Sequence, residues 1–287
     1  MIRFRITFVE KKGLRGTMVG AFHKVLVAGV CLGLTGAGTG AFAAAPEASA
    51  LSKRNPLRVL IVPEKDRPEF FAVDGKNPGF EREIIEGFAK ANKLALEVVV
   101  VPKWDALVPA LTEGKGDVAA GHFTNTEERR EHVDFTQGLL PTRSVIITRK
   151  PKPAVTTLKQ LQGERVGAIK GSAVLEDLLA AGVPRANIDD SITQNNILDA
   201  LRSGKVTCLV RSVPLAVLSQ RDDPEIQLGM FLGGGSHFAF GVRKGDSVLL
   251  EALNTHIDLL NQTGQWNRLV VKYFGANAVD ILKKAQQ

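Results

Sequence analysis

From residue 56 onward, short runs of aliphatic and β-branched residues alternate with stretches whose apolar residues recur every three or four positions. Leu57 to Val62 and Ala95 to Val101 are strand-like runs, and Phe80, Ile84 and Phe88 between them mark one face of a helix. The same alternation continues through the second half of the chain. Strands that alternate with helices favour parallel sheets covered on both faces, so the sequence predicts an α/β protein.

Two segments of the chain are similar to each other. Residues 110–115 (ALTEGK) and 200–205 (ALRSGK) share Ala, Leu, Gly and Lys, and a β-rich run follows each. Gly-Lys after a helix is common C-cap chemistry, so chance is one explanation, and two similar α/β lobes are the simpler one. After a predicted strand from Phe238 to Val242, two long helical patterns end at Gly264 and Gly275. These helices suggest that the chain returns to pack on a lobe already formed.

The first 43 residues have the pattern of a secretory signal peptide. Residues 1–24 carry six Lys and Arg against one acid, residues 25–42 carry no charge, and Ala41-Phe42-Ala43 is an A-x-A cleavage site. We predict cleavage after Ala43, a short leader over residues 44–55 and a periplasmic product. A transmembrane anchor and a lipoprotein built on Cys31 are the alternatives.

Most of the net charge of +7 lies in this signal segment. Its removal leaves about +2, so a polyanionic partner such as nucleic acid is not expected. Cys208 is then the remaining cysteine, which excludes an intramolecular disulfide. The apolar neighbours of Cys208 favour a buried, inert thiol.

The sequence contains no pattern that requires a metal, a cofactor or catalysis. The histidines of the mature chain, His122, His132, His237 and His256, do not stand at metal-ligand spacing, and no G-x-S-x-G motif occurs. Residues 233–236 (GGGS) lack the lysine and the following helix of a phosphate-binding loop, so we predict a flexible connection there. We therefore expect no metal site, no cofactor, no catalytic residue and a protein that is not an enzyme.

The clearest binding signal lies in residues 117–130. A strand ends there, and Asn125 or Thr126 can cap a short helix that begins at Glu127. Ligands of open α/β sheets collect at the carboxyl ends of the strands, where helix N-termini favour anions. Arg129 lies one turn into this helix and can reach back with a bidentate guanidinium. The alternative is that Arg129 merely solvates an exposed helix face.

Several short motifs occur in the order typical of one known family. They are GFEREI at 79–84, WDALVPAL at 104–111, TNTEER at 124–129, VDFT at 133–136, LQGERVG at 161–167 and KYFG at 272–275. As an ordered set from Leu57 to Gly275, they resemble the family 3 extracellular solute-binding proteins, the periplasmic components of amino-acid ABC importers. The resemblance implies a two-lobed periplasmic binding protein fold of type II, in which each lobe is a mainly parallel sheet flanked by helices.

The resemblance also implies how the chain is divided. The first lobe is discontinuous, with residues 56–143 and 241–287, and the second lobe has residues 144–240. The crossings are expected near Thr142 to Ile146 and His237 to Gly241. A ligand is held in the cleft, and the lobes close around it by a hinge motion. The expected protein is a monomer that captures a small carboxylate-bearing solute, an amino acid or a related organic acid, for an ABC permease in the inner membrane.

The first lobe supplies most of the implied ligand contacts. Arg129 matches the arginine that clamps the α-carboxylate of the ligand, and Thr124 matches a hydroxyl partner beside it. Trp104 matches an apolar or aromatic cleft position. Gly121 and His122 match positions whose backbone or side chain faces the ligand.

The implied contacts depart from the family pattern at two places, one in each lobe. Ser172, which follows Gly171, matches a donor. Ser212 stands where amino-acid binders usually carry the aspartate that pairs with the α-ammonium group, and Arg211 precedes it. The aromatic residue expected after the first strand is replaced by Asp66. Either Asp66 contacts the ammonium group from the other lobe, or the ligand is an organic acid without that group, because a serine cannot supply the charge.

Two other functions are compatible with the same fold. Some relatives are periplasmic dehydratases of the cyclohexadienyl dehydratase type, and here Asp66 and His122 would be the acid–base candidates. Other relatives sense ligands for a kinase or a cell-wall enzyme, which would require a separate signalling partner for this chain.

Overall fold

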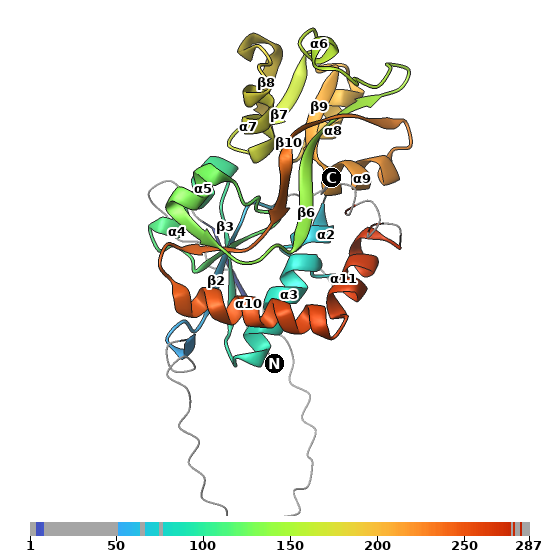
Figure 1. Ribbon diagram of the computed structural model, residues 1–287. Helices are drawn as coiled ribbons and strands as arrows, with labels where there is room; N and C mark the ends of the chain where they lie inside the picture. Colours follow the sequence, from blue (N-terminus) through green and yellow to red (C-terminus); the bar gives the residue numbers. More distant parts are fainter. Residues whose placement is uncertain are drawn as a thin grey trace, which may run out of the picture.

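The computed structural model describes residues 4–8, 51–63, 67–74, 77–276, 278 and 282. These residues form two β-sheets flanked by helices, as the sequence predicts (Figure 1). We call the six-stranded sheet with its helices the first lobe, and the five-stranded sheet with its helices the second lobe.

The sheet of the first lobe is mixed. Its strands are β1 (Phe4–Phe8), β2 (Leu57–Ile61), β3 (Leu96–Val100), β4 (Val118–Ala120), β5 (Val133–Phe135) and β11 (Gly241–Arg243). The pairs β1/β3, β3/β2 and β2/β4 are parallel, whereas β11 lies antiparallel between β4 and β5. Its helices are α2 (Pro68–Phe71), α3 (Phe80–Ala91), the 3-10 turn η1 (Trp104–Ala106), α4 (Leu107–Thr112), α5 (Glu127–His132), α10 (Ser247–Gln262) and α11 (Gln265–Phe274). The chain therefore returns to the first lobe at its C-terminal end.

Both faces of this sheet are buried, because helices cover both. On one face Val59 of β2 packs with α3, α10 and α11, and on the other face Leu60 packs with α4. The predicted helix face of Phe80, Ile84 and Phe88 is almost fully buried in α3. The two-residue period of the strand and the 3.6-residue period of the helix thus produce a three-layer lobe.

The sheet of the second lobe is mixed as well. Its strands are β6 (Leu140–Arg149), β7 (Val166–Ile169), β8 (Ile188–Ile192), β9 (Cys208–Ser212) and β10 (Ile226–Phe238). The pairs β9/β7 and β7/β8 are parallel, and the pairs β10/β6 and β6/β9 are antiparallel. Its helices are α6 (Leu158–Leu161), α7 (Ala173–Ala180), the 3-10 turn η2 (Arg185–Asn187), α8 (Ile197–Arg202) and α9 (Val213–Asp222).

The two lobes are connected by a long antiparallel ribbon. Strands β6 and β10 pair from Leu140 opposite Phe238 to Arg149 opposite Ile226, and Figure 1 shows both strands running from the first lobe into the second. The predicted crossings near Thr142 and His237 lie in this ribbon. The predicted lobe boundaries at residues 143 and 240 remain a prediction.

Two sequence predictions around β10 are wrong. Residues 233–236 are part of this strand and are not a loose connection. Leu232 pairs with Ser144 and Ser236 pairs with Thr142 of β6, the three glycines form an irregularity between these two pairs, and Arg143 Nε donates to Gly233 O over 3.0 Å. The predicted strand from Phe238 to Val242 is divided, since β10 ends at Phe238 and β11 begins at Gly241.

The structure also differs from simple sequence expectations at one helix start and at two elements of the second lobe. A cap at Asp105, a residue type that commonly caps helices, would be expected for α4; instead Asp105 pairs with Lys103 at 3.0 Å, and Ala106 occupies the N-cap position. The pattern analysis also did not identify β8, whose apolar ends flank Asp-Asp-Ser, or α9, which buries residues around most of its circumference. A helix buried on several sides has no polar stripe to reveal its period.

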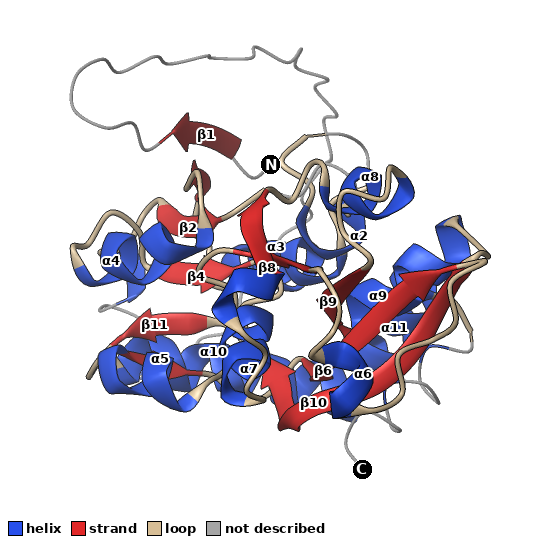
Figure 2. Ribbon diagram, turned by 90° about the horizontal axis from the view of Figure 1, so that it is seen from above, coloured by secondary structure: helices blue, strands red, loops and turns tan. Residues whose placement is uncertain are grey.

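The described N-terminal residues add contacts to the first lobe. Strand β1 pairs with β3 and lies at one margin of the molecule, far from β6 and β10 (Figure 2). Of the predicted leader, Leu51 is buried in the core of the first lobe and Arg54 pairs with Asp246 at 2.7 Å, so this end of the leader is packed. The predicted cleavage site after Ala43 lies outside the described residues.

Candidate functional site

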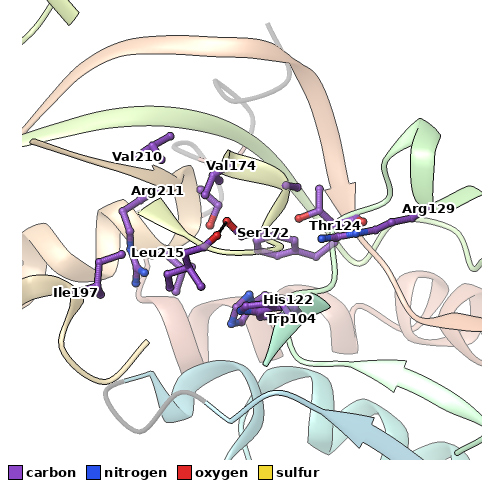
Figure 3. Close-up of a pocket in the computed structure, with 14 residues that line it drawn as sticks. Trp104, His122, Thr124, Arg129, Ser172, Val174, Ile197, Val210, Arg211 and Leu215 are labelled. Atoms are coloured by element: carbon purple, nitrogen blue, oxygen red, sulfur yellow. Dashed lines mark hydrogen bonds between the residues drawn. The ribbon is translucent and has the colours of Figure 1, made fainter. Parts of the chain in front are cut away.

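A cavity lies between the lobes (Figure 3). The first lobe and the start of the returning chain supply Trp104, His122, Thr124, Arg129 and Phe238, and the second lobe supplies Ile169, Ser172, Ala173, Val174, Ile197, Val210, Arg211, Ser212 and Leu215. Most of this wall is apolar, and its polar groups come from both lobes. The cavity therefore has the form of a small-molecule site.

Aromatic rings form one side of the cavity. The ring centroids of Trp104 and His122 are 4.9 Å apart, and His122 also lies 5.0 Å from Phe70 and 5.7 Å from Phe238. His122 has a φ of 53°, in the left-handed region, and follows Gly121 with a φ of 87°. This reversal of the chain after β4 turns the imidazole toward the rings.

The side chain of Glu81 stabilises this turn of the backbone at Gly121 and His122. Its two carboxylate oxygens accept hydrogen bonds from the backbone N–H groups of Gly121 and His122, both at 2.7 Å. Glu81 is completely buried, and burial raises its pKa to about 7, although the Gly121 N–H, the charge of His122 and the His122 N–H oppose the rise. The backbone N–H of Gly121 is thus donated to Glu81, and Gly121 is not among the cavity wall residues.

Arg129 crosses from the first lobe to the second. Thr126 caps α5 by accepting from Arg129 N, which places the side chain one turn inside the helix as predicted. Its Nη1 donates to Thr124 O at 2.9 Å, and its Nη2 donates to Gly171 O of the second lobe at 3.2 Å. Burial lowers the pKa of Arg129, against the opposing charges of Glu176 and Glu128.

The packing at Gly171 explains why a glycine stands there. Its φ is 73°, and a Cβ would lie 2.6 Å from Asp105 N in the first lobe. Close approach of the two lobes at this point therefore requires a residue without a side chain. Gly171 lines an adjoining surface hollow instead of the main cavity.

The second lobe turns the N-terminal ends of two helices toward the cavity. Ser172 is the N-cap of α7 and donates from Oγ to Ile169 O at 2.6 Å. Ser212 is the N-cap of α9, and its buried Oγ makes no hydrogen bond in the described structure. Arg211, the last but one residue of β9, is 3% exposed and lines the cavity beside Leu215.

A second set of contacts joins the lobes at α2 and α9. Arg67 donates to Asp222 Oδ2 at 2.6 Å and to Ser219 Oγ at 3.1 Å, and Arg221 pairs with Glu69 at 2.6 Å. We call these five residues the α2–α9 latch. Together with the Arg129 contact to Gly171, the latch connects the two lobes.

Seven of the ten residues implied by the resemblance line the cavity: Trp104, His122, Thr124, Arg129, Ser172, Arg211 and Ser212. Gly121 and Gly171 lie next to it, and Asp66 lies outside the described residues. The sequence did not predict a role for Glu81, nor did it predict the apolar residues of α7, α8 and α9 that line the cavity. Glu81 had no local signal, because its partners are 40 and 41 positions away.

A family model described as "Bacterial extracellular solute-binding proteins, family 3" matches residues 57–276. The chain belongs to this family. The family's role is to bind solutes outside the cytoplasm, and this chain is a substrate-binding protein. In the described residues no helix is long and apolar enough to cross a membrane, and no group of His, Cys, Asp and Glu could hold a metal ion.

Three relatives show the range of this family. A probable histidine-binding protein of Campylobacter jejuni is 29% identical over 72% of this chain and 80% of its own length. A membrane-bound lytic murein transglycosylase F of Desulfosudis oleivorans is 25% identical over 80% of this chain, which spans about half (52%) of that enzyme. An ancestral arginine-binding protein in complex with arginine is 28% identical and superimposes with a TM-score of 0.65, over 77% of this chain and 99% of that protein. Binding proteins and an enzyme thus carry a similar module.

Proposed function

We propose that the protein captures a small carboxylate-bearing solute, an amino acid or a related organic acid, in the cavity between the lobes. Residues 56–143 with 241–287 and residues 144–240 are the proposed rigid units, and the ligand stabilises their closed arrangement. The proposed contacts are Trp104, His122, Thr124, Arg129, Ser172, Arg211 and Ser212. The family supports delivery to an ABC permease in the inner membrane.

The position of Arg129 carries this proposal. Arg129 is 7% exposed and lines the cavity, and its guanidinium donates to a carbonyl of each lobe. A buried guanidinium is stabilised more strongly by a carboxylate than by neutral carbonyls, and its planar donors match the two carboxylate oxygens. A ligand carboxylate at this place would touch both lobes at once, so its binding energy would favour closure.

The periplasmic location and the monomeric state are part of the same proposal. The N-terminal signal pattern and the extracellular family support export, with cleavage after Ala43. A single cavity enclosed by the two lobes of one chain requires no second copy for ligand binding.

Replacement of Arg129 tests the proposal. Wild-type protein, Arg129→Met and the neighbouring Arg130→Met are screened by thermal shift against amino acids, dicarboxylates and aromatic acids. Arg130 has a 48% exposed side chain, so it is the matched control for loss of one charge on the same helix. We expect a ligand that raises the melting temperature of wild type and Arg130→Met and fails to raise that of Arg129→Met. An equal shift in Arg129→Met would disprove the assigned site.

A dehydratase-like enzyme is the second candidate. His122 is the titratable wall residue in the described part of the cavity apart from the two arginines, and it lies beside the Trp104 ring where a substrate would pack. Conversion of prephenate or a similar acid by the purified protein, followed by absorbance, would establish this activity. Binding without turnover would support the transport function.

A further inference from the structure

Aliphatic side chains form much of the cavity wall away from Arg129. Three segments of the second lobe meet there: Ile197 begins α8, Val210 lies in β9, and Leu215 lies in the first turn of α9. All three side chains are buried. Figure 3 shows Ile197 and Leu215 at the opposite side of the drawn residues from Arg129. A ligand whose carboxylate binds Arg129 would therefore extend its remaining part toward these aliphatic side chains.

Both lobes contribute apolar groups to the space that the ligand would fill. Trp104 of the first lobe lines the cavity, and helix α7 of the second lobe adds Ala173 and Val174. Trp104, Ile169 and Ile197 belong to one continuous cluster of buried apolar residues that spans the two lobes. An apolar side group of the ligand would thus have apolar neighbours in each lobe. Its burial would favour the closed arrangement, because an open cleft would leave it in contact with water.

Several polar side chains of the wall already have partners in the protein. Ser172 Oγ donates to Ile169 O at 2.6 Å. His122 and Arg211 also have interaction partners of their own. A polar side group of the ligand would have to displace these interactions or remain without a hydrogen bond. Either outcome weakens binding, because burying an amide or a hydroxyl without a partner costs free energy.

A charged side group is also a poor match for this wall. The described wall residues include no aspartate or glutamate that could pair with a cationic side group. An anionic side group would have to displace the partner that Arg211 already has. The buried hydroxyl of Ser212, which makes no hydrogen bond in the described structure, can serve one polar atom but cannot neutralise a charge. A buried charge without a charged partner is costly, so a neutral side group is favoured.

We propose that the ligand carries a neutral, apolar side group, branched aliphatic or aromatic, which packs between Trp104 and the aliphatic residues of the second lobe. This inference rests on the proposed function and adds the chemical class of the ligand. Val174 and Leu215 are then residues that determine specificity between apolar ligands and their polar counterparts. An arginine-bound relative has the same fold, so the preference belongs to the wall residues and not to the fold.

Pairs of compounds with the same shape test the proposal by isothermal titration calorimetry. The pairs are L-leucine with L-asparagine, L-valine with L-threonine, and 4-methylpentanoate with succinamate, which both lack an amino group; L-phenylalanine, L-arginine, L-lysine and L-glutamate are added. Each buried methyl group strengthens binding about fourfold. We therefore expect at least one apolar compound to bind ten times or more tightly than its polar partner and than each charged amino acid. Equal or tighter binding of the polar partners or of a charged amino acid would overturn the proposal.

Variants of the wall link this preference to the residues. Leu215→Asn keeps the shape of the side chain, places an amide in the wall and should reduce the apolar-over-polar ratio of affinities at least tenfold. Val174→Thr should reduce the ratio about threefold. Leu179→Asn is the matched control, because Leu179 lies on α7 of the same lobe, is 44% exposed and is not among the cavity wall residues; its ratio should not change. Melting temperatures identify a variant that fails to fold, and the partly buried Val174→Thr then decides the question alone.

The outcomes separate the two proposals. If the polar and apolar compounds bind equally and Arg129→Met abolishes binding of both, the proposed function holds and the apolar preference is wrong. If Arg129→Met leaves binding of every compound unchanged, the site assigned to the proposed function is wrong. An unchanged apolar-over-polar ratio in both Leu215→Asn and Val174→Thr refutes the placement of the side group against this wall.

Discussion

The buried carboxyl group of Glu81 should make the stability of the protein fall as the pH rises. Burial raises its pKa from the ordinary value of 4.5 to about 7. A raised pKa means that the native state holds the proton more tightly than the unfolded chain. The contribution of Glu81 to stability is therefore fully present below pH 4.5 and is lost as the pH rises through 7. At about 1.4 kcal/mol for each pH unit, the loss is about 3 kcal/mol.

The perturbation is Glu81→Gln, which keeps the shape and removes the titration. The amide can accept from only one of the two backbone N–H groups of Gly121 and His122, and the lost hydrogen bond costs about 1.5 to 3 kcal/mol at every pH, in addition to the pH-dependent contribution of Glu81. The informative quantity is the dependence on pH. The free energy of unfolding of wild type minus that of the variant should decrease by about 3 kcal/mol between pH 4.5 and pH 8.

Urea denaturation followed by circular dichroism measures this difference at intervals of half a pH unit. Glu113→Gln is the control, because the Glu113 side chain is 55% exposed and pairs with an exposed lysine, and its difference should stay within about 1 kcal/mol. A difference for Glu81→Gln that is constant or increases with pH would refute the reasoning. An increase would mean that the hydrogen bonds from the two backbone N–H groups lower the pKa of Glu81 more than burial raises it.

The remaining predictions concern the latch and the cysteine. Glu69→Gln combined with Asp222→Asn should separate the lobes of the ligand-free protein, which small-angle X-ray scattering would detect as a larger radius of gyration. The double variant should also bind ligand about fivefold more weakly, because partly exposed ion pairs contribute about 1 kcal/mol. Unchanged scattering would show that the latch does not hold the lobes together. Burial raises the pKa of Cys208 to about 12, so protein that begins at residue 44 should not react with a thiol reagent at pH 8 until urea is added. Rapid labelling of this protein in its native state would contradict the prediction.

The sequence was informative wherever a structure is determined by neighbours along the chain. The spacing of Phe80, Ile84 and Phe88 predicts the buried face of α3. Asn125 and Thr126 before Glu127 predict the cap of α5, and Thr126 is the residue that forms it. Local side-chain chemistry determines both features. The resemblance to a known family also predicted the two-lobed topology, because the motifs occur in the order typical of that family.

The rest of the site depends on partners that are distant in sequence. Glu81 reads as one acid among several on the polar face of α3, and only the folded chain brings it under Gly121 and His122. The residues of the latch are separated by about 150 positions, and the apolar wall combines residues from three helices of the second lobe. The glycines at 233–235 were predicted to be a connection because the pairs that flank them, Leu232 with Ser144 and Ser236 with Thr142 of β6, leave no mark in the glycine sequence itself.

The pairing of β1 with β3 has a consequence for the preparation of this protein. Phe4–Phe8 covers the backbone of Leu96–Val100 in parallel, and Thr7 bonds Glu97 across the pair. Cleavage after Ala43 would remove this partner and leave β3, a valine-rich strand, with unpaired N–H and C=O groups along its outer side. The precursor and the processed protein would then differ in their tendency to associate through this strand. Recombinant protein that begins at residue 44 and protein that retains residue 4 should be compared by light scattering before either is used for binding measurements.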